Sequence, residues 1–180
     1  MNVGATSETD YGDYFMWGST TPNTNTPCDW EHAPFNNHSS DYNETYFNSV
    51  KDTVCPNGIL AKEYDAASQI MGGDWRMPTK AEFQELIKNT TKEWVDNYNG
   101  SGVNGWKFTS KTDTSKYIFI PASDVRSDSS FIVQGFNGNV WSSSHYASKP
   151  YRAWNLNFRS ADASVSSYNR CDGFVVRGVL

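Results

Sequence analysis

The spacing of the apolar residues changes along this chain, and that change constrains the fold more than any other feature. Over residues 60–71 and 79–89 the apolar side chains recur at helical spacing. After residue 105 the spacing shortens to two residues, which is typical of half-buried strands. Two helices followed by several short strands predict a single α+β domain over residues 1–180.

The two predicted helices have recognisable ends. The first is expected to run from about Leu60 to Met71 and to stop at the pair Gly72–Gly73. The second is expected to begin at Thr79, because Thr79 followed by Glu82 forms a capping box in which each side chain binds the other residue's backbone N–H. It is expected to end near Asn89.

Strands are predicted where apolar residues alternate or form a short apolar run. Residues 10–18 combine aromatic residues with glycine and are expected to form a strand at the edge of the core, closed by Gly18. Residues 19–58, poor in apolar side chains, are expected to be a long surface excursion largely without regular structure. The remaining predicted strands are 105–108, 117–120, 138–142, 153–158 and 173–180.

The composition excludes several classes of protein. Mean hydropathy is -0.66, yet aromatic residues make up 15% of the chain, and disordered chains lack aromatic residues. A net charge of -5 argues against a nucleic-acid binder that depends on phosphate contacts. No apolar run approaches the roughly 18 residues of a membrane span. The charge is uneven, because residues 137–180 hold five Lys or Arg against two Asp or Glu.

The inventory of reactive side chains favours a protein that is not an enzyme. The three cysteines are either free thiols or include one disulfide between Cys28 and Cys55. Cys171 has only His145 as a nearby partner for nucleophilic catalysis, and neither phosphate-loop nor hydrolase motifs occur. No cofactor and no metal site are expected, because the carboxylates and the three histidines show no ligand spacing.

Several carboxylates and tryptophans could have either a functional role or a purely structural one. Glu82 and Glu85 do not stand out as a hydrolytic pair, since Glu82 already caps a helix. Oxygen ligands for calcium could come from Asp124 with Asp128, or from residues 41–44, but both read better as solvated turns. Four tryptophans could stack on sugars but are expected to be core residues, namely Trp75, Trp106, Trp141 and Trp154.

Several ordered segments resemble a known family. Residues 12–22 (GDYFMWGSTTP), 63–67 (EYDAA) and 72–86 (GGDWRMPTKAEFQEL) are similar to the opening, first helix, turn and second helix of the Fibrobacter succinogenes major paralogous domain (FISUMP). Residues 141–144, 153–158 and 173–177 are similar to its C-terminal strands. The resemblance covers almost the whole chain except the polar excursion, and it implies a C-type lectin-like fold.

The last quarter, about residues 137–180, resembles the variable region of proteins diversified by retroelements in gut bacteria and their phages. In those systems adenines are miscopied. An AAY codon can therefore come to encode Asn, Tyr, Ser, Asp, His, Arg, Cys or Ala, but never Trp, Met, Lys, Gln or Glu. Residues 145–172 hold the permitted types, with Lys149 as a departure. They interrupt a frame that is expected to stay fixed: Trp141, residues 153–158, Arg170 and Gly173.

The resemblance implies a set of diversified, ligand-contacting positions on this rigid frame. Cys171 belongs to this set and would be a free thiol produced by diversification. The full set is His145, Tyr146, Ser148, Tyr151, Arg152, Arg159, Asp162, Ser164, Ser166, Ser167, Tyr168, Asn169, Cys171 and Asp172.

The expected function is therefore non-enzymatic binding of a protein or glycan on a target cell or phage. A calcium-dependent lectin is an alternative, although Leu156 follows Trp154–Asn155 where such lectins usually carry an acid. An enzyme related to formylglycine-generating enzymes is another, although Cys171 has no paired cysteine. The protein is expected at a cell surface, secreted or on a phage particle. Residues 1–6 show no signal peptide and read as the middle of a domain, so a missing native N-terminus is expected.

Overall fold

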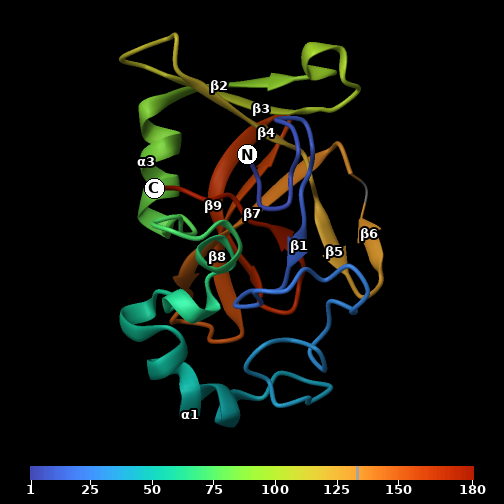
Figure 1. The fold of residues 1–180 in the computed structure, drawn as a ribbon, viewed down its shortest axis with the longest axis vertical. Coiled ribbons are helices and arrows are strands. Elements are labelled where there is room, and N and C mark those ends of the chain that lie inside the picture. Colours follow the sequence, from blue (N-terminus) through green and yellow to red (C-terminus); the bar gives the residue numbers. More distant parts are fainter. Residues whose placement is uncertain (133) are drawn as a thin grey trace.

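The computed structural model of the chain describes residues 1–132 and 134–180, and a five-stranded sheet forms its centre (Figure 1). The strand order is β1-β10-β7-β8-β9. Strands β10 and β7 pair in parallel, and the other neighbours are antiparallel. The bounds are β1 Tyr14–Phe15, β7 Asn137–His145, β8 Arg152–Arg159, β9 Asp162–Asn169 and β10 Phe174–Val175.

Two smaller sheets complete the strands. The first has the order β2-β3-β4 and lies at one end of the molecule, above α3 in Figure 1. The second is the β5-β6 hairpin. Their bounds are β2 Thr90–Val95, β3 Gly105–Ser110, β4 Tyr117–Pro121, β5 Val125–Ser127 and β6 Ser130–Ile132.

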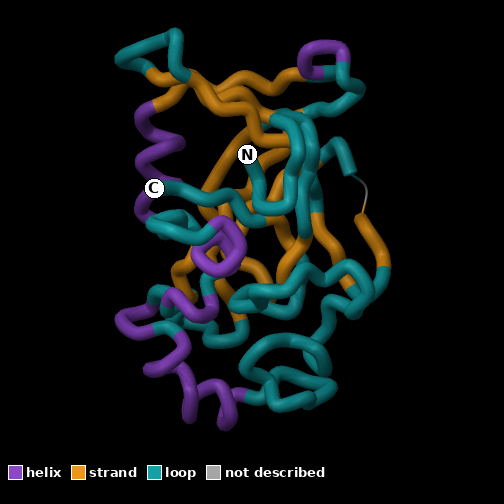
Figure 2. The backbone as a smooth tube through the Cα atoms, viewed as in Figure 1, coloured by secondary structure: helices purple, strands orange, loops and turns teal. Residues whose placement is uncertain are grey.

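Helices and loops cover the rest of the chain (Figure 2). The α-helices are α1 Glu44–Val54, α2 Ala66–Met71 and α3 Lys80–Asn89. Single 3₁₀ turns lie at Pro56–Gly58, Lys62–Tyr64 and Tyr98–Gly100. The described residues therefore have the predicted α+β class, with one α-helix more than the sequence indicated.

The alternation of the central strands buries a different apolar cluster on each face of the sheet. Val140, Leu156 and Val175 point toward α3 and the β2-β3-β4 sheet, where Phe83 of α3 joins their cluster. Their neighbours Trp141 and Phe174 point to the opposite face and pack with Trp17, with Phe47 of α1 and with the short α2. The sheet is thus the shared wall between two cores.

The first and last segments of the chain meet beside this sheet. Asn2 pairs with Arg177 in an antiparallel bridge, and the backbone N–H of Val3 donates to the carbonyl of Val176 at 2.8 Å. Both ends lie in the half of the molecule away from α1 (Figure 1).

The predicted helix at Thr79 is confirmed together with its cap. The Thr79 Oγ1 accepts from the N–H of Glu82 at 3.2 Å, and a Glu82 carboxylate oxygen accepts from the N–H of Thr79 at 2.8 Å. Arg76 adds two hydrogen bonds to the same carboxylate, at 2.8 and 2.6 Å. These bonds lower the pKa of Glu82 to about 2.

Two helix predictions need correction. The helix expected over residues 60–71 is α-helical only from Ala66, because Asp65 caps it by accepting from the N–H of Ser68. It does end at Gly72, whose φ is 71°. The excursion over residues 19–58 contains α1, which was not predicted because this polar helix buries only Phe47 and Val54 and so lacks a clear apolar stripe.

The strand predictions were correct for part of the chain. Strands β3, β4, β7 and β8 fall on predicted segments, whereas β2, β5, β6 and β9 were not predicted. The strand expected over residues 173–180 is regular only at Phe174–Val175, and beyond it Arg177 and Val179 make isolated bridges. The aromatic segment 10–18 contributes the two residues of β1.

The three cysteines are free and buried, so the alternative of a Cys28–Cys55 disulfide is wrong. Cys28 and Ala33 of the excursion form a small cluster with Met16 and Cys171. Cys55 instead packs in the core beside α1. Burial raises the pKa of Cys28 and of Cys171 to about 12.

Candidate functional site

The predicted diversified residues occupy three places along three strands that pair side by side, β7, β8 and β9. One is the turn of residues 145–152 between β7 and β8, which we call the variable turn. The second is the β8-β9 hairpin at the free edge of the sheet. The third is residues 169–172, which follow β9 directly. The variable turn and residues 169–172 meet at one end of β8 and β9, where Arg152 pairs with Asn169, whereas Arg159 and Asp162 pair at the other end.

Strand β9 divides its residues between two environments. Ala163 and Val165 point toward α3 and pack on the core there. Asp162, Ser164 and Tyr168 alternate with them and are exposed, with Tyr168 at 37%. Ser166 lies on the same outward face and is half-buried. On this strand the alternation puts four predicted diversified positions on the outward face, whereas the other face carries the undiversified Ala163 and Val165 together with the diversified Ser167 and Asn169.

The neighbouring strand β8 supplies the buried frame. Ala153, Asn155, Leu156 and Phe158 are at most 1% exposed, in contrast to the exposed Arg159 at the strand end. The phenyl ring of Phe158 lies so close to Gly138 of β7 that any side chain there would overlap it, because a Cβ on Gly138 would lie 1.9 Å from the ring. The predicted frame residues Trp141, Arg170 and Gly173 are buried as well.

Asparagine side chains connect β7 and β8 on the face of the sheet that also carries Trp141. The amides of Asn155 and Asn157 both donate to the Asn139 Oδ1, at 2.9 and 2.8 Å. Asn155 is 0% exposed, and its own Oδ1 has no hydrogen-bond partner among the described residues. Asn155 therefore acts as a buried part of the frame.

The variable turn is ordered by its own backbone and by the aromatic residues beneath it. Its N–H groups at Lys149 and Arg152 donate to the carbonyls of Tyr146 and Lys149, at 3.1 and 2.8 Å. His145 is half-buried against Trp17 and Phe47, and this burial lowers its pKa. Its Nε2 lies 3.1 Å from the Pro150 carbonyl oxygen.

The tyrosines of the variable turn lie against residues that the prediction did not include. Tyr146 packs on Trp154 with ring centroids 4.7 Å apart, and the Lys80 ammonium lies 3.5 Å from the centroid of the same Trp154 ring. Tyr151 packs on Tyr42 of the excursion at 5.7 Å. The prediction of a surface excursion largely without regular structure is therefore incomplete, and the aromatic residues of the excursion were the available signal that part of it packs on the site.

Not every predicted position is accessible. Ser148, at the tip of the variable turn, is exposed, and Arg152, Asn169 and Asp172 are half-buried. Ser167 and Cys171 are buried at 8% and 6%, because Ser167 lies on the core side of β9 and Cys171 packs under the excursion. These two side chains therefore add little to the exposed surface, and the raised pKa of Cys171 makes it a poor nucleophile.

Of the four tryptophans expected in the core, Trp106 and Trp141 are buried, whereas Trp75 and Trp154 are half-buried. Asp124, one of the weighed calcium ligands, is 3% exposed. Within residues 1–132 and 134–180, no group of three or more His, Cys, Asp or Glu side chains could hold a metal ion.

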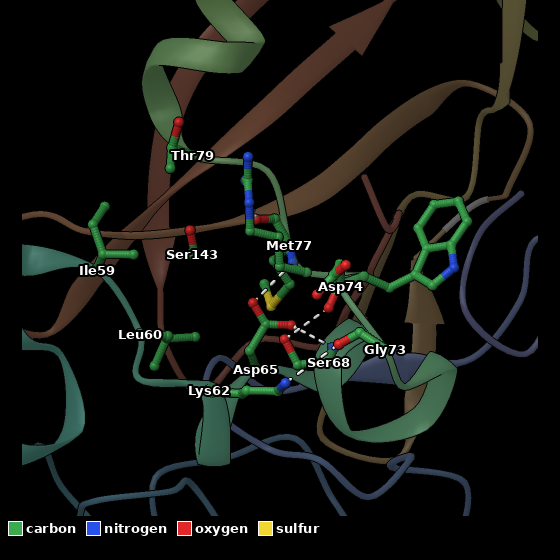
Figure 3. A pocket seen from close by; sticks show the side chains of 12 residues that line it. Ile59, Leu60, Lys62, Asp65, Ser68, Gly73, Asp74, Met77, Thr79 and Ser143 are labelled. Carbon is green, nitrogen blue, oxygen red and sulfur yellow. Dashed lines mark hydrogen bonds between the residues drawn. The ribbon is translucent and has the colours of Figure 1, made fainter. Parts of the chain in front are cut away.

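A pocket of about 360 Å³ lies apart from the variable turn, where α2 meets the start of α3 (Figure 3). Asp65 lies at its base, with one carboxylate oxygen accepting from the N–H of Ser68 at 2.9 Å and the other from the N–H of Met77 at 2.8 Å. The Lys62 ammonium donates to the Gly73 carbonyl at 3.3 Å. These hydrogen bonds join the segment around α2 to the turn before α3, so Lys62 and Asp65 have structural partners within the fold.

Comparisons with protein-family models, with curated proteins and with solved structures gave no match. No helix in the described part of the chain has both the length and the apolar character needed to cross a membrane.

Proposed function

We propose that this protein is a non-enzymatic binding protein with a C-type lectin-like fold. Its exposed surface on the variable turn and the β8-β9 hairpin is diversified by a retroelement and recognises a protein or glycan on a target cell or phage. The frame beneath this surface keeps the fold while the exposed side chains change. Location at a cell surface, in secreted form or on a phage particle follows from such a role.

The alternation along β9 carries this proposal. The residues that the AAY codon pattern marks as exchangeable include every outward position from Asp162 to Tyr168, while Ala163 and Val165 fill the core. The codon pattern restricts residue types only, and Ala163 is itself of a permitted type, so the division by face comes from the strand. A strand whose outward residues change freely can keep its packing, because the two faces of a strand contact different neighbours.

The chemistry of the exposed positions suits recognition of varied targets. The exposed Tyr168 and the half-buried Tyr146 and Tyr151 offer rigid aromatic area at a small cost in conformational entropy, and the serines between them offer adaptable hydrogen bonds. Arg159 and Asp162, at the exposed end of the hairpin, add one charge of each sign. This mixture provides contact area and polar contacts without a fixed reactive group.

Diversification is tested on the genome that encodes the chain. We expect a near-identical template repeat beside a reverse-transcriptase gene, differing from this coding sequence only at adenines. Mismatches should fall in the codons of Ser164, Ser166 and Tyr168 and be absent from those of Trp141 and Phe158. A template that differs at frame codons, or the absence of any template, would contradict the proposal.

The binding surface is tested with two displayed libraries. One randomises the outward residues Asp162, Ser164, Ser166 and Tyr168, and the matched control randomises the frame positions Ala153, Asn155, Leu156 and Phe158. Protease resistance measures folding, and selection against one purified probe protein measures binding. We expect most clones of the first library to fold and some to bind, and most clones of the second to be cleaved. Equal folding in both libraries would contradict the division into frame and surface.

A further inference from the structure

The guanidinium of Arg170 is a buried cation enclosed by aromatic rings. The side chain is 0% exposed, and its Cζ lies 3.9 Å from the ring centroid of Phe47. The rings of Tyr42, Trp17 and Trp30 surround it at 5.6, 5.8 and 5.9 Å. Among the described residues no carboxylate forms an ion pair with it. The ring faces therefore supply much of the compensation for its positive charge.

The hydrogen bonds of Arg170 connect segments that are far apart in the sequence. Its Nε donates to the Pro150 carbonyl of the variable turn at 3.0 Å, and its Nη1 donates to the Pro34 carbonyl of the excursion at 3.4 Å. Its backbone N–H donates to the carbonyl of Tyr151 at 2.9 Å, and its own carbonyl accepts from the N–H of Trp17 at 3.0 Å. One residue thus joins the excursion, the variable turn and the aromatic segment 10–18.

The variable turn and the excursion each form hydrogen bonds within their own segment. The variable turn forms hydrogen bonds between its own backbone groups. In the excursion, the Asn36 amide donates to the carbonyls of Trp30, Ser39 and Asp41, at 2.7 to 3.0 Å. The excursion also packs on other parts of the fold through Phe35, whose ring centroid lies 5.0 Å from that of Tyr64. Direct contacts between the excursion and the turn add to their relative placement, and Arg170 reaches both.

We propose that Arg170 is a positioning residue that holds the variable turn against residues 29–43 of the excursion. The two segments then form one continuous surface, on which Tyr42 of the excursion lies beside Tyr151 of the turn. An arginine suits this place, because its planar group stacks on several rings while its separate N–H groups reach carbonyls in different directions. The consequence for ligand binding rests on the proposed function, whereas the positioning itself does not.

Hydrogen–deuterium exchange of the full chain tests the positioning without a ligand. Arg170→Met places an apolar side chain of similar length among the aromatic rings. It removes the charge and the side-chain hydrogen bonds to the Pro150 and Pro34 carbonyls. We expect exchange in residues 29–43 and 145–152 to quicken by about tenfold or more, with residues 80–121 unchanged, because local opening need not involve the whole domain. Arg170→Lys should restore part of the protection, since it keeps the charge but not the fork of donors.

Two further variants decide between positioning and general packing. Arg152→Met, the matched control, removes a half-buried arginine whose Cζ lies 5.9 Å from the Tyr168 ring, and it should leave residues 29–43 unchanged. Tyr42→Leu changes a residue of the excursion that contacts both Arg170 and Tyr151, and it should still quicken exchange in the variable turn. The proposal is overturned if Arg170→Met affects neither segment, or affects residues 80–121 equally. Should Arg170→Met fail to fold, an unchanged turn in Tyr42→Leu overturns it.

Discussion

The two ends of the central sheet are stabilised by different kinds of contact. At the α3 end, Phe83, Leu156 and Phe158 form an ordinary apolar cluster with the β2-β3-β4 sheet. At the opposite end, a buried arginine and a buried asparagine hold long irregular segments through their backbone carbonyls. An apolar cluster depends on the shape of many side chains, whereas carbonyl contacts are independent of which side chains the held segment carries. The second arrangement therefore suits a region whose side chains vary.

The largest effect is expected at the apolar end. Phe158→Ala removes a ring that lies against Gly138 and faces Phe108 at 6.5 Å, and it should lower the free energy of unfolding by about 3–5 kcal/mol. Chemical denaturation measures the loss. Ser164→Ala, at an exposed position on the outward face of β9, is the control, and it should cost under about 1 kcal/mol. Similar losses for the two variants would contradict the division between frame and surface.

An intermediate and more local effect is expected from Asn36→Ala in the excursion. The side chain is 0% exposed, donates to three carbonyls and accepts from the N–H of Asn43 at 2.7 Å. Its removal leaves buried backbone groups unpaired and should cost about 2 kcal/mol or more. Limited proteolysis should show new cleavage between residues 29 and 43 while α3 stays protected. Loss of protection in α3 to the same degree would show that the two ends unfold as one unit.

The smallest effect concerns Asp172, whose burial raises the pKa of its carboxyl from 3.8 to about 6. Between these values the unfolded chain is ionised while the folded chain still holds the proton, so stability falls as pH rises from about 4 to 6. Asp172→Asn should remove this fall and gain about 1–2 kcal/mol at pH 7 over the wild type. Denaturation of both proteins from pH 4 to 7 measures the difference. A constant difference across this range would show that the carboxyl titrates normally.

The pKa of Glu82 is shifted in the opposite direction to that of Asp172, so the two carboxyls affect stability in different pH ranges. Its pKa is lowered to about 2 by Arg76, so the stability it contributes is lost as pH falls from about 4.5 toward 2. The Glu82 carboxylate is 41% exposed, and solvent screening keeps this contribution small. Of these two carboxyls, Glu82 therefore affects stability on the acid side and Asp172 in the range above pH 4.

The sequence predicted those parts of the fold whose signals are local. The Thr79–Glu82 capping box and the Gly72 stop depend on residues within one turn, and both are present. Strand β9 was missed because its core face carries only Ala163 and Val165, too little apolar area to stand out between serines. The frame of β8 was predicted because Trp154, Leu156 and Phe158 alternate plainly.

The part of the candidate site that could not be predicted depends on contacts distant in sequence. Nothing in the sequence around Arg170 shows that its charge is buried among Trp17, Trp30, Tyr42 and Phe47, which lie more than a hundred residues earlier. Burial of Cys171 likewise depends on the excursion that covers it. A codon pattern identifies which residues can change, but it carries no information about which of them the fold leaves exposed.

The pairing of Asn2 with Arg177 has a consequence for how the domain can be attached to a larger structure. Chain extensions at either end would leave from neighbouring points, in the half of the molecule away from α1 (Figure 1). A stalk, a lipid anchor or a carrier protein could therefore be joined to either terminus and give the domain nearly the same orientation. The same closeness would allow the whole domain to be spliced into a loop of a host protein.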